Sequence, residues 1–574
     1  MTLENLDLNA TLKPRINSTV ECPVNQDGSF VLYLPTVNLR KKHNPAFSLA
    51  CHIANKHQVP VLVLAIVLDD THLPNKGQKP IVFTARRIAF VLEAMQQASC
   101  EWQDHGAGVA VRVHGPSSRT PHHLTLVQQS VAVVSDEPFV NPYLSFVQSV
   151  ERVARRSKVP LYRVDGSTTV APVCMLQKKV DFDGNVSYKD VPKKAWLWQK
   201  KTDPNRRGQV YGVVQDGHFD APALTKRLQP NFFLDKDTAT TLNLPGDWTN
   251  PDTPSPGKRP WTVEELSAIT DLKAWILDWP GIDASVPPCS QTHGSTAAGQ
   301  QRWNRFRQAH LSSYAKLRNG IAKPHAVSRM SCYLNYGVVS IFQIIFELWQ
   351  SKGSGGASKY ADEIIKWREI GYVHAFCYPQ HYNQAAVIPQ WARTYLSRCH
   401  QSSSGSSYTL ERLECCTTRD DTWNAMQKYL NSTGELHNNA RMTWGKTVVH
   451  WQKHNYAVDE LLHQLVYLND RYALDGLSPP SYAGLLWCFG WCDKPASDKK
   501  SIAEKPASRY RQGPNAFEEA KRALLVSDVA QVPIAAMLEQ PSAKKQKKEE
   551  STLQPRKPSI LSYFPPPTHA NSVG

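Results

Sequence analysis

Two kinds of apolar pattern alternate along residues 29–170. Short runs of continuous apolar residues are separated by longer stretches with helical spacing. Continuous runs are typical of strands buried on both faces of a parallel sheet, and the longer stretches are typical of the helices that cover it. The pattern predicts an α/β domain with a parallel, five-stranded, Rossmann-like sheet. We expect strands at 30–35, 59–70, 109–115, 130–136 and 160–166, and helices at 44–57 and 85–98.

The pattern differs on either side of this domain. Residues 1–28 show no regular period and predict an irregular lead-in, whereas residues 171–258 are rich in Pro, Lys and Asp and predict an interdomain connector. Over residues 259–494 the apolar positions take helical spacing, which predicts an all-α domain. The clearest elements are helices at 326–350 and 358–372, and flexible Ser- and Gly-rich loops at 351–359 and 401–407.

Residues 495–574 turn polar and basic, which predicts a disordered tail. The run PSAKKQKKEE (541–550) resembles a nuclear import signal, so we expect a nuclear protein, with an organellar site also open; a solvated Lys-rich tail is the alternative. The segment ILSYF (560–564) resembles a peptide that binds the sliding clamp of replication, with a chance match as the alternative. Its anchors would be Ile560, Tyr563 and Phe564, with Lys557 in place of the usual Gln.

Composition narrows the class of partner. The chain of 574 residues carries a formal net charge of +16, which favours a polyanion such as nucleic acid. Its twelve Cys are scattered, without a C-x-x-C pair or a His at zinc spacing, so we expect reduced thiols and no metal site. The longest apolar run, 59–68, is too short to span a bilayer, and the N-terminus lacks the features of a secretory signal. We therefore expect no membrane partner, and we expect a monomer.

Polar residues stand among large apolar ones over residues 433–476, where burial is costly unless they are paired or hold a ligand. On a helix, Trp444 and Trp451 share one face, and Arg441 lies one turn before Trp444. If only the two Trp are considered, a helix face that packs into the hydrophobic core explains them. A buried guanidinium, however, needs an acid partner, which Asp470 or Asp475 could supply. The segment therefore favours a cofactor site over plain packing.

Glu363 and Trp367 are four residues apart and share a helix face as well. A carboxylate beside a flat aromatic ring suits a planar polar ligand, although a partly exposed helix position would show the same pair.

Several segments match one known family in its own order. They are NLRKKHNPAFSLA (38–50), SRMSCYLNYG (328–337), YADEIIKWREIGYVHAFCYPQHYN (360–383), PQWARTYL (389–396), DTWNAMQ (421–427), GELHNNARMTWGKTVVHW (434–451) and LNDRYALDG (468–476). Over roughly residues 29–494 the chain resembles the photolyase/cryptochrome family, and most closely the class II cyclobutane pyrimidine dimer photolyases. The resemblance implies a FAD-dependent lyase that repairs dimers in DNA by light-driven electron transfer from reduced FAD.

The resemblance also implies a role for each matching residue. The residues implied around FAD are Tyr314, Arg318, Ser328 and Ser331 near its phosphates and ribose, Leu334 as a further contact, Glu363 at the adenine and the damaged bases, Arg441 and Asp475 as an ion pair beside the flavin, and Asn469 facing flavin N5. The residues implied in electron transfer are Trp423, Trp444 and Trp451, with Trp451 at the solvent end. The residues implied at the lesion are Trp367, Met442 and Trp487; Met442 could equally fill a gap in the core.

Some positions depart from the class II pattern. After the last motif the class has W-S-I-x-G-x-H-D-x-x-W, whereas this chain reads WCFGWCDKPAS from Trp487 onward. Cys492 stands at the His position, Asp493 aligns only across a one-residue gap, and the final Trp is missing. Cys332 and Asn335 replace a Pro and a His of the first motif.

These departures leave two rival readings. One is a cryptochrome-like blue-light photoreceptor that binds FAD without repairing DNA. The other is a DNA-tethered scaffold that works through its clamp-like tail. The sequence also leaves the antenna chromophore open between a deazaflavin, a folate and none.

Overall fold

The computed structural model describes residues 6–68, 84–114, 120–173, 203–253, 255–351, 355–402, 407–491 and 512–528. Residues 1–529 form one compact unit and residues 530–574 form another, which is outside the described part. Cys492, Asp493, the run at 541–550 and the clamp-like segment 560–564 also lie outside it. The nuclear and clamp-binding predictions therefore stay predictions.

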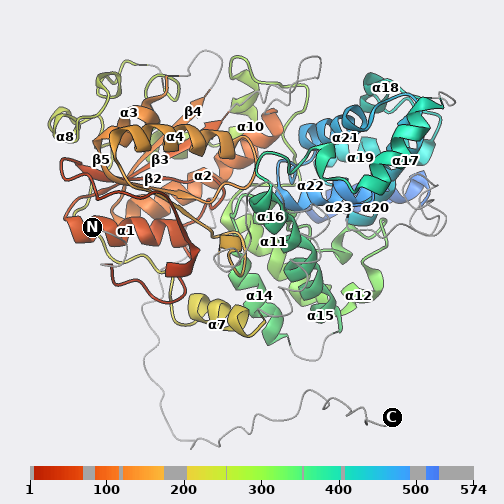
Figure 1. Ribbon diagram of the computed structural model, residues 1–574, viewed down its shortest axis with the longest axis horizontal. Helices are drawn as coiled ribbons and strands as arrows, with labels where there is room; N and C mark the ends of the chain where they lie inside the picture. Colours follow the sequence, from red (N-terminus) through yellow and green to blue (C-terminus); the bar gives the residue numbers. More distant parts are fainter. Residues whose placement is uncertain are drawn as a thin grey trace, which may run out of the picture. The chain divides into compact units, whose positions relative to one another are not determined.

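The described chain begins with a six-stranded sheet in the order β1-β6-β5-β2-β3-β4 (Figure 1). Strands β2 to β6 pair in parallel, and right-handed crossovers place α1 and α2 on one face and α3 and α4 on the other. The predicted α/β fold is thus confirmed. The elements are β1 (Ile16–Val20), β2 (Phe30–Leu34), α1 (Pro45–His57), β3 (Val61–Leu68), α2 (Ala85–His105), β4 (Gly108–His114), α3 (His122–Gln129), β5 (Ser130–Asp136), α4 (Tyr143–Ser157) and β6 (Leu161–Val164).

The lead-in contributes a strand that was not predicted. β1 pairs antiparallel with β6, with Ile16 opposite Val164, and makes six strands where five were expected. Only its end residues, Ile16 and Val20, are buried, and the three between them are half-exposed. The apolar pattern is therefore too weak to mark a strand. Pairing with β1 covers the backbone edge of β6, which is the physical reason for the strand.

The connector also contains regular structure, namely α7 (Asp203–Val214) and α8 (Lys236–Thr241). α7 packs against α14 (Ile341–Gln350), where the Tyr211 ring lies 5.3 Å from the Phe346 ring and 6.1 Å from the Trp349 ring, centroid to centroid. The connector is thus packed onto the helical region.

The remainder of the described chain is helical, as predicted. Its helices are α9 (Val263–Ala268), α10 (Leu272–Trp275), α11 (Thr296–Ala309), α12 (Tyr314–Leu317), α13 (Ser331–Asn335), α14, α15 (Gly355–Asp362), the π-helix η7 (Glu363–Arg368), α16 (Glu369–Cys377), α17 (Gln390–Gln401), α18 (Leu410–Glu414), α19 (Asp421–Thr433), α20 (Asn438–Gln452), α21 (Val458–Tyr472), α22 (Pro479–Cys488) and α23 (Pro514–Asp528), beside short 3-10 turns.

The apolar stretch 326–350 is not the single helix that was predicted. It breaks between α13 and α14 at Gly337, whose φ is +59°. A Cβ on Gly337 would meet the carbonyl oxygen of Val37 at 2.2 Å. The close approach of the sheet layer therefore requires a glycine in this conformation, and it ends the first helix there.

Two segments that were predicted to be flexible are helical. Residues 355–359 begin α15, because Gly356 packs against the carbonyl oxygen of Leu311, which a Cβ would meet at 1.8 Å. Residues 514–528 of the predicted disordered tail form α23. Its Phe517, Ala520 and Leu524 are buried at helical spacing within the core of the helical region. Residues 403–406 of the other predicted loop lie outside the described part.

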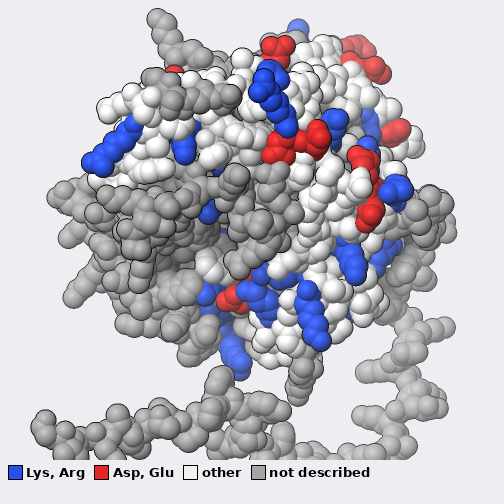
Figure 2. Space-filling view, turned by 90° about the vertical axis from the view of Figure 1, so that its right-hand side faces the viewer, with Lys and Arg blue, Asp and Glu red and all other residues white. Residues whose placement is uncertain are grey.

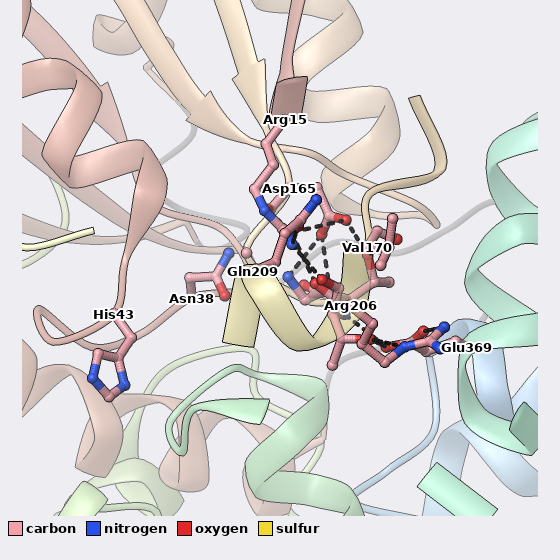
Figure 3. A network of polar contacts seen from close by, with 12 residues as sticks. Arg15, Asn38, His43, Asp165, Val170, Arg206, Gln209 and Glu369 are labelled. Atoms are coloured by element: carbon pink, nitrogen blue, oxygen red, sulfur yellow. Dashed lines mark hydrogen bonds and ion pairs between the residues drawn. The ribbon is translucent and has the colours of Figure 1, made fainter. Parts of the chain in front are cut away.

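A buried polar network joins the lead-in, the sheet, the connector and α16 (Figure 3). Arg15 donates to the carbonyl oxygens of Thr168 and Thr169 at 2.8 and 2.6 Å. Thr169 donates to Glu369 Oε1 through its backbone N–H at 2.6 Å and through its hydroxyl at 2.7 Å, and it accepts from Arg206 Nε at 2.8 Å. Glu369 begins α16 directly after η7. The network therefore fixes this end of η7 to the sheet.

Two arginines at the start of α2 reach from the sheet layer into the helical region. Arg87 donates to the carbonyl oxygens of Asp470, Ala473 and Gly476 at 2.5, 2.8 and 3.2 Å, and Arg86 donates to those of Leu430, Asn431 and Tyr472 at 3.2, 2.6 and 2.8 Å. These carbonyls end α19 and α21 or lie in the turn after α21. Most carbonyls at the end of a helix lack an intrahelical partner, and the helix dipole is negative there, so this is a favourable place for a guanidinium.

None of the described helices has the length and apolarity that a bilayer span needs. Within the same residues, no three His, Cys, Asp or Glu side chains gather as a metal site would require.

Candidate functional site

The helical region contains a cavity of about 720 Å³, a volume typical of sites for cofactors and other small ligands. Its wall comes from the chain around α12 and α13, from α15 and η7, from the first half of α20, from the turn before α22 and α22 itself, and from α23. The predicted residues that line it are Tyr314, Arg318, Ser328, Ser331, Leu334, Glu363, Trp367, Arg441, Met442, Asp475 and Trp487. The fold therefore brings together residues that the sequence predicted as one site.

Arg441 and Asp475 form the ion pair that the resemblance implies. Arg441 NH2 lies 2.7 Å from Asp475 Oδ1, and the two side chains are only 11% and 17% exposed. Gly434, with φ +69°, ends α19 and lets the chain turn into α20, which carries Arg441. Asp475 follows α21 in the turn that Arg87 holds. The pair places a neutralised cation on the wall, where it can favour an electron-rich ligand.

Asn469 is the one predicted cofactor contact that does not line the cavity. Its side chain is buried, and its amide nitrogen donates to Asp470 Oδ1 and to Ser481 Oγ, both at 2.8 Å. Ser481 does line the cavity. Asn469 is therefore hydrogen-bonded to a residue of the cavity wall, and its contact with flavin N5 stays a prediction.

Basic side chains hold Glu363 at another part of the wall. Arg318 NH1 lies 2.9 Å from Glu363 Oε1, and Lys359 Nζ lies 2.8 Å from the same atom. Ser328 Oγ accepts from the Tyr360 hydroxyl at 2.6 Å. Burial raises the pKa of Tyr314 to about 12, so its phenol stays protonated and remains a donor. These cations and hydroxyl groups suit a phosphate-bearing ligand.

Glu435 joins three segments beside the cavity. It accepts from Arg329 Nε at 2.6 Å, from Arg302 NH1 at 3.0 Å and from the Thr292 hydroxyl at 3.0 Å. Burial by itself raises the pKa of Glu435, but the charges of Arg329 and Arg302 outweigh it and bring the pKa down to about 2. The carboxylate is therefore charged at neutral pH and forms ion pairs with both arginines.

The π-helix η7 lies between α15 and α16 and carries Glu363 and Trp367. Such turns are frequent at functional sites. Both residues line the cavity, as their predicted common face requires. The Trp367 ring meets the Trp487 ring edge to face at 5.1 Å, and the Lys366 ammonium lies 5.0 Å from the Trp367 ring centroid. The two half-buried indoles form an aromatic section of the wall that suits a stacked base.

The three Trp residues predicted for electron transfer form a connected chain of ring contacts, with Trp423 in the middle. Trp444 stacks on Trp423, with ring centroids 6.4 Å apart and planes 7° from parallel, and Trp423 contacts Trp451 at 5.5 Å. Trp423 and Trp444 are fully buried, whereas Trp451 is partly exposed. Trp444 lies one turn after Arg441 on α20. The contacts thus define the order Trp444, Trp423, Trp451 from the cavity side toward solvent.

Several residues of the wall were not predicted. Ser481, His437, Lys446 and Phe517 line the cavity, and burial lowers the pKa of His437 to about 4. For Phe517 a signal exists, since Phe517, Ala520 and Leu524 have the spacing of one helix face. No comparable sequence pattern marks Ser481, whose place depends on the packing of α22.

The surface of the helical region carries charges of both signs. Figure 2 looks at this side of the molecule and shows Lys and Arg gathered in its lower part, with Asp and Glu mixed among them above. A basic area on a protein of net charge +16 suits a polyanionic partner.

Comparison with known proteins gives a consistent result, although no family model matches the chain. A deoxyribodipyrimidine photo-lyase of Methanothermobacter thermautotrophicus is 24% identical over 475 residues, which is 82% of this chain and 89% of that protein. Proteins of the same name from Arabidopsis thaliana and Potorous tridactylus are 30% and 29% identical, over 42% and 39% of this chain. Those two matches span 51% and 44% of the relatives.

Two solved structures share the fold. A class III photolyase from Agrobacterium tumefaciens has a TM-score of 0.54 at 14% identity and covers 86% of both chains. A Synechocystis cryptochrome has a TM-score of 0.56 at 13% identity and covers 88% of this chain and 90% of its own. The fold is thus that of photolyases and cryptochromes. Together, the fold and the sequence relatives support the photolyase/cryptochrome family for this chain.

We predict that Glu435 contributes to stability above its ordinary pKa of 4.5 and that this contribution is lost as the pH falls from 4.5 toward about 2. Its full size is up to roughly 3 kcal/mol at neutral pH. Urea unfolding of Glu435→Gln should show that loss at pH 7, and the difference from wild type should shrink below pH 4.5. The exposed Glu411 provides the control, because Glu411→Gln should change stability by less than about 0.5 kcal/mol at either pH. An equal loss for Glu435→Gln at pH 7 and at low pH would contradict the prediction.

Proposed function

We propose that this chain repairs cyclobutane pyrimidine dimers in DNA with FAD held in the helical cavity. The observation that carries the proposal is that one cavity joins the Arg441–Asp475 pair and the Trp367–Trp487 contact, with a Trp stack beginning one turn from Arg441. The relatives in an archaeon, a plant and a marsupial, all named deoxyribodipyrimidine photo-lyase, support the same activity, as do the class II motifs.

The residues on the wall fit FAD. The volume of about 720 Å³ is large enough for a dinucleotide cofactor, and the wall combines apolar and aromatic residues with a smaller number of charged and polar ones. Arg318, Lys359 and Ser328 offer donors for phosphate and ribose oxygens, while Arg441 offers a cation beside a ring. When bound, reduced FAD supplies light-driven electron transfer to a dimer and takes the electron back after the ring opens.

The protein's own role in this proposal is to place a charged side chain beside the flavin ring and aromatic side chains beside the damaged bases. Asp475 neutralises Arg441, so the guanidinium can face a negative ring without leaving a buried charge unpaired. Trp367 and Trp487 offer aromatic surface to bases that have left the duplex stack. The contacts among Trp444, Trp423 and Trp451 provide a route by which reducing equivalents can enter from solvent.

The rival hypothesis, a photoreceptor, also requires bound FAD and the Trp stack. The solved structures with the same fold include both a photolyase and a cryptochrome. The Trp367–Trp487 contact on the wall favours repair, since photoreception does not require an aromatic surface for damaged bases. An antenna chromophore of deazaflavin or folate type, and the nuclear location, stay predictions.

A repair assay separates the readings. Full-length protein carrying reduced FAD is mixed with an oligonucleotide that contains one defined thymine dimer and is exposed to blue light, and the dimer is quantified by chromatography. We expect light-dependent loss of the dimer. Trp487→Ala should keep FAD and lose most of the repair, because it removes half of the aromatic contact. If the wild-type protein binds FAD but does not repair the dimer, the photoreceptor hypothesis is favoured over repair. If it binds no FAD, both the repair and the photoreceptor hypotheses are excluded.

We further expect Trp444→Phe to slow photoreduction of bound FAD to a small fraction of the wild-type rate, because phenylalanine is much harder to oxidise than tryptophan. Bleaching of the flavin absorption under blue light with an external reductant measures this rate. Trp102→Phe is the matched control: Trp102 is also fully buried, but it lies in the sheet layer, in contact with Tyr33 and Phe47. Equal rates for Trp444→Phe and the wild type would contradict the assigned route.

A further inference from the structure

Ser481 occupies a defined place on the cavity wall. It is the third residue of α22, 5% exposed, and its backbone N–H donates to the hydroxyl of Ser478, which caps the helix. Two groups donate to its hydroxyl oxygen: Asn469 Nδ2 at 2.8 Å and Arg441 NH1 at 3.4 Å. A serine hydroxyl has two lone pairs and one hydrogen. Both lone pairs of Ser481 are therefore occupied by protein donors.

The orientation of the Asn469 amide is fixed independently by Asp470. Asp470 Oδ1 accepts from Leu477 N at 2.9 Å, and Asp470 Oδ2 accepts from the Tyr482 hydroxyl at 2.8 Å. A carboxylate surrounded by donors requires the nitrogen of the Asn469 amide, and not its oxygen, on the near side. That nitrogen has two hydrogens, one directed at Asp470 and one at Ser481. Asn469 therefore cannot accept the Ser481 hydrogen through the same atom.

The hydrogen of the Ser481 hydroxyl thus has no acceptor among the described residues, and Ser481 borders the cavity. A buried donor without a partner costs free energy. A ligand atom that accepts this hydrogen would remove that cost and so bind more tightly. The next serine along the wall behaves differently, because the Ser478 hydroxyl donates to the carbonyl oxygen of Asp475 at 2.7 Å.

We propose that Ser481 donates a hydrogen bond to an acceptor atom on the ring system of the bound cofactor, beside Arg441, and that the Asn469 amide positions the Ser481 hydroxyl for this bond. The proposal rests on the proposed function in that the cofactor is FAD. It makes Ser481 a contact residue and Asn469 a positioning residue, whose amide keeps the Ser481 lone pairs occupied and its hydrogen directed into the cavity.

The consequence is a selective wall. A hydroxyl with both lone pairs occupied can donate but cannot accept, so it favours ligand atoms with a lone pair and disfavours N–H or O–H groups at the same place. Arg441 imposes the same preference from the neighbouring position, because a guanidinium carries donors and no acceptor.

The test is a binding cycle on protein from which FAD has been removed. FAD is titrated with the apo-protein and followed by its fluorescence, and the visible absorption band of bound FAD is recorded for each variant. We expect Ser481→Ala to raise the Kd about fivefold, the equivalent of one hydrogen bond, and to shift the band. Ser481→Thr, which keeps the hydroxyl, should restore both. Ser130→Ala is the matched control and should leave the band in place, because Ser130 is buried in β5, does not line the cavity, and donates its hydrogen to the carbonyl oxygen of Val127.

The coupling of the two residues is tested in the same assay. Asn469→Ala should weaken FAD binding more in the wild-type background than in the Ser481→Ala background, because only the wild type has a hydroxyl for the amide to position. Circular dichroism melting verifies that each variant is folded. An unchanged Kd and band for Ser481→Ala would overturn the contact, and an equal effect of Asn469→Ala in both backgrounds would overturn the positioning role. Wild-type apo-protein that takes up no FAD would instead overturn the proposed function, which keeps the two failures distinct.

Discussion

The site depends on one buried cation, the guanidinium of Arg87, which crosses from α2 of the sheet layer to the end of α21. It satisfies the carbonyl oxygens of Asp470, Ala473 and Gly476, which have no helical partners, at the negative end of a helix dipole. Asp475 lies inside the turn that these bonds fix. Because Asp475 holds Arg441, and Arg441 and Asn469 both donate to Ser481, the charge and hydrogen-bond pattern of this wall follows from a residue outside the helical region.

The sheet layer therefore also helps to fix the positions of the segments that form the cavity wall. Gly337 lets the backbone near Val37 approach the helical region, and the network of Arg15, Thr169 and Glu369 fixes the start of α16 just after η7. Loss of a buried pair or of a carbonyl partner is expensive, since the group left behind stays away from water. These contacts explain why the cavity keeps a definite shape although its wall comes from many separate segments.

Much of this could be predicted from the sequence, and the exceptions have a common cause. Strands β2 to β6 followed from continuous apolar runs, and the Arg441–Asp475 pair followed from the cost of a buried guanidinium together with the motif resemblance. β1 has a weak pattern because only its two ends are buried. The role of Ser481 depends on partners 12 and 40 positions away, and Arg87 binds backbone carbonyls, which no side-chain pattern reveals. Contacts of this kind are fixed by packing between elements.

The most direct test of the central claim is the structure of the chain with FAD bound. We predict electron density for the flavin ring beside Arg441 and Asp475, with a ring acceptor atom within hydrogen-bond distance of Ser481 Oγ and the phosphates toward Arg318 and Lys359. Density for FAD outside this cavity, or inside it with the ring placed away from Arg441, would contradict the assignment of the site.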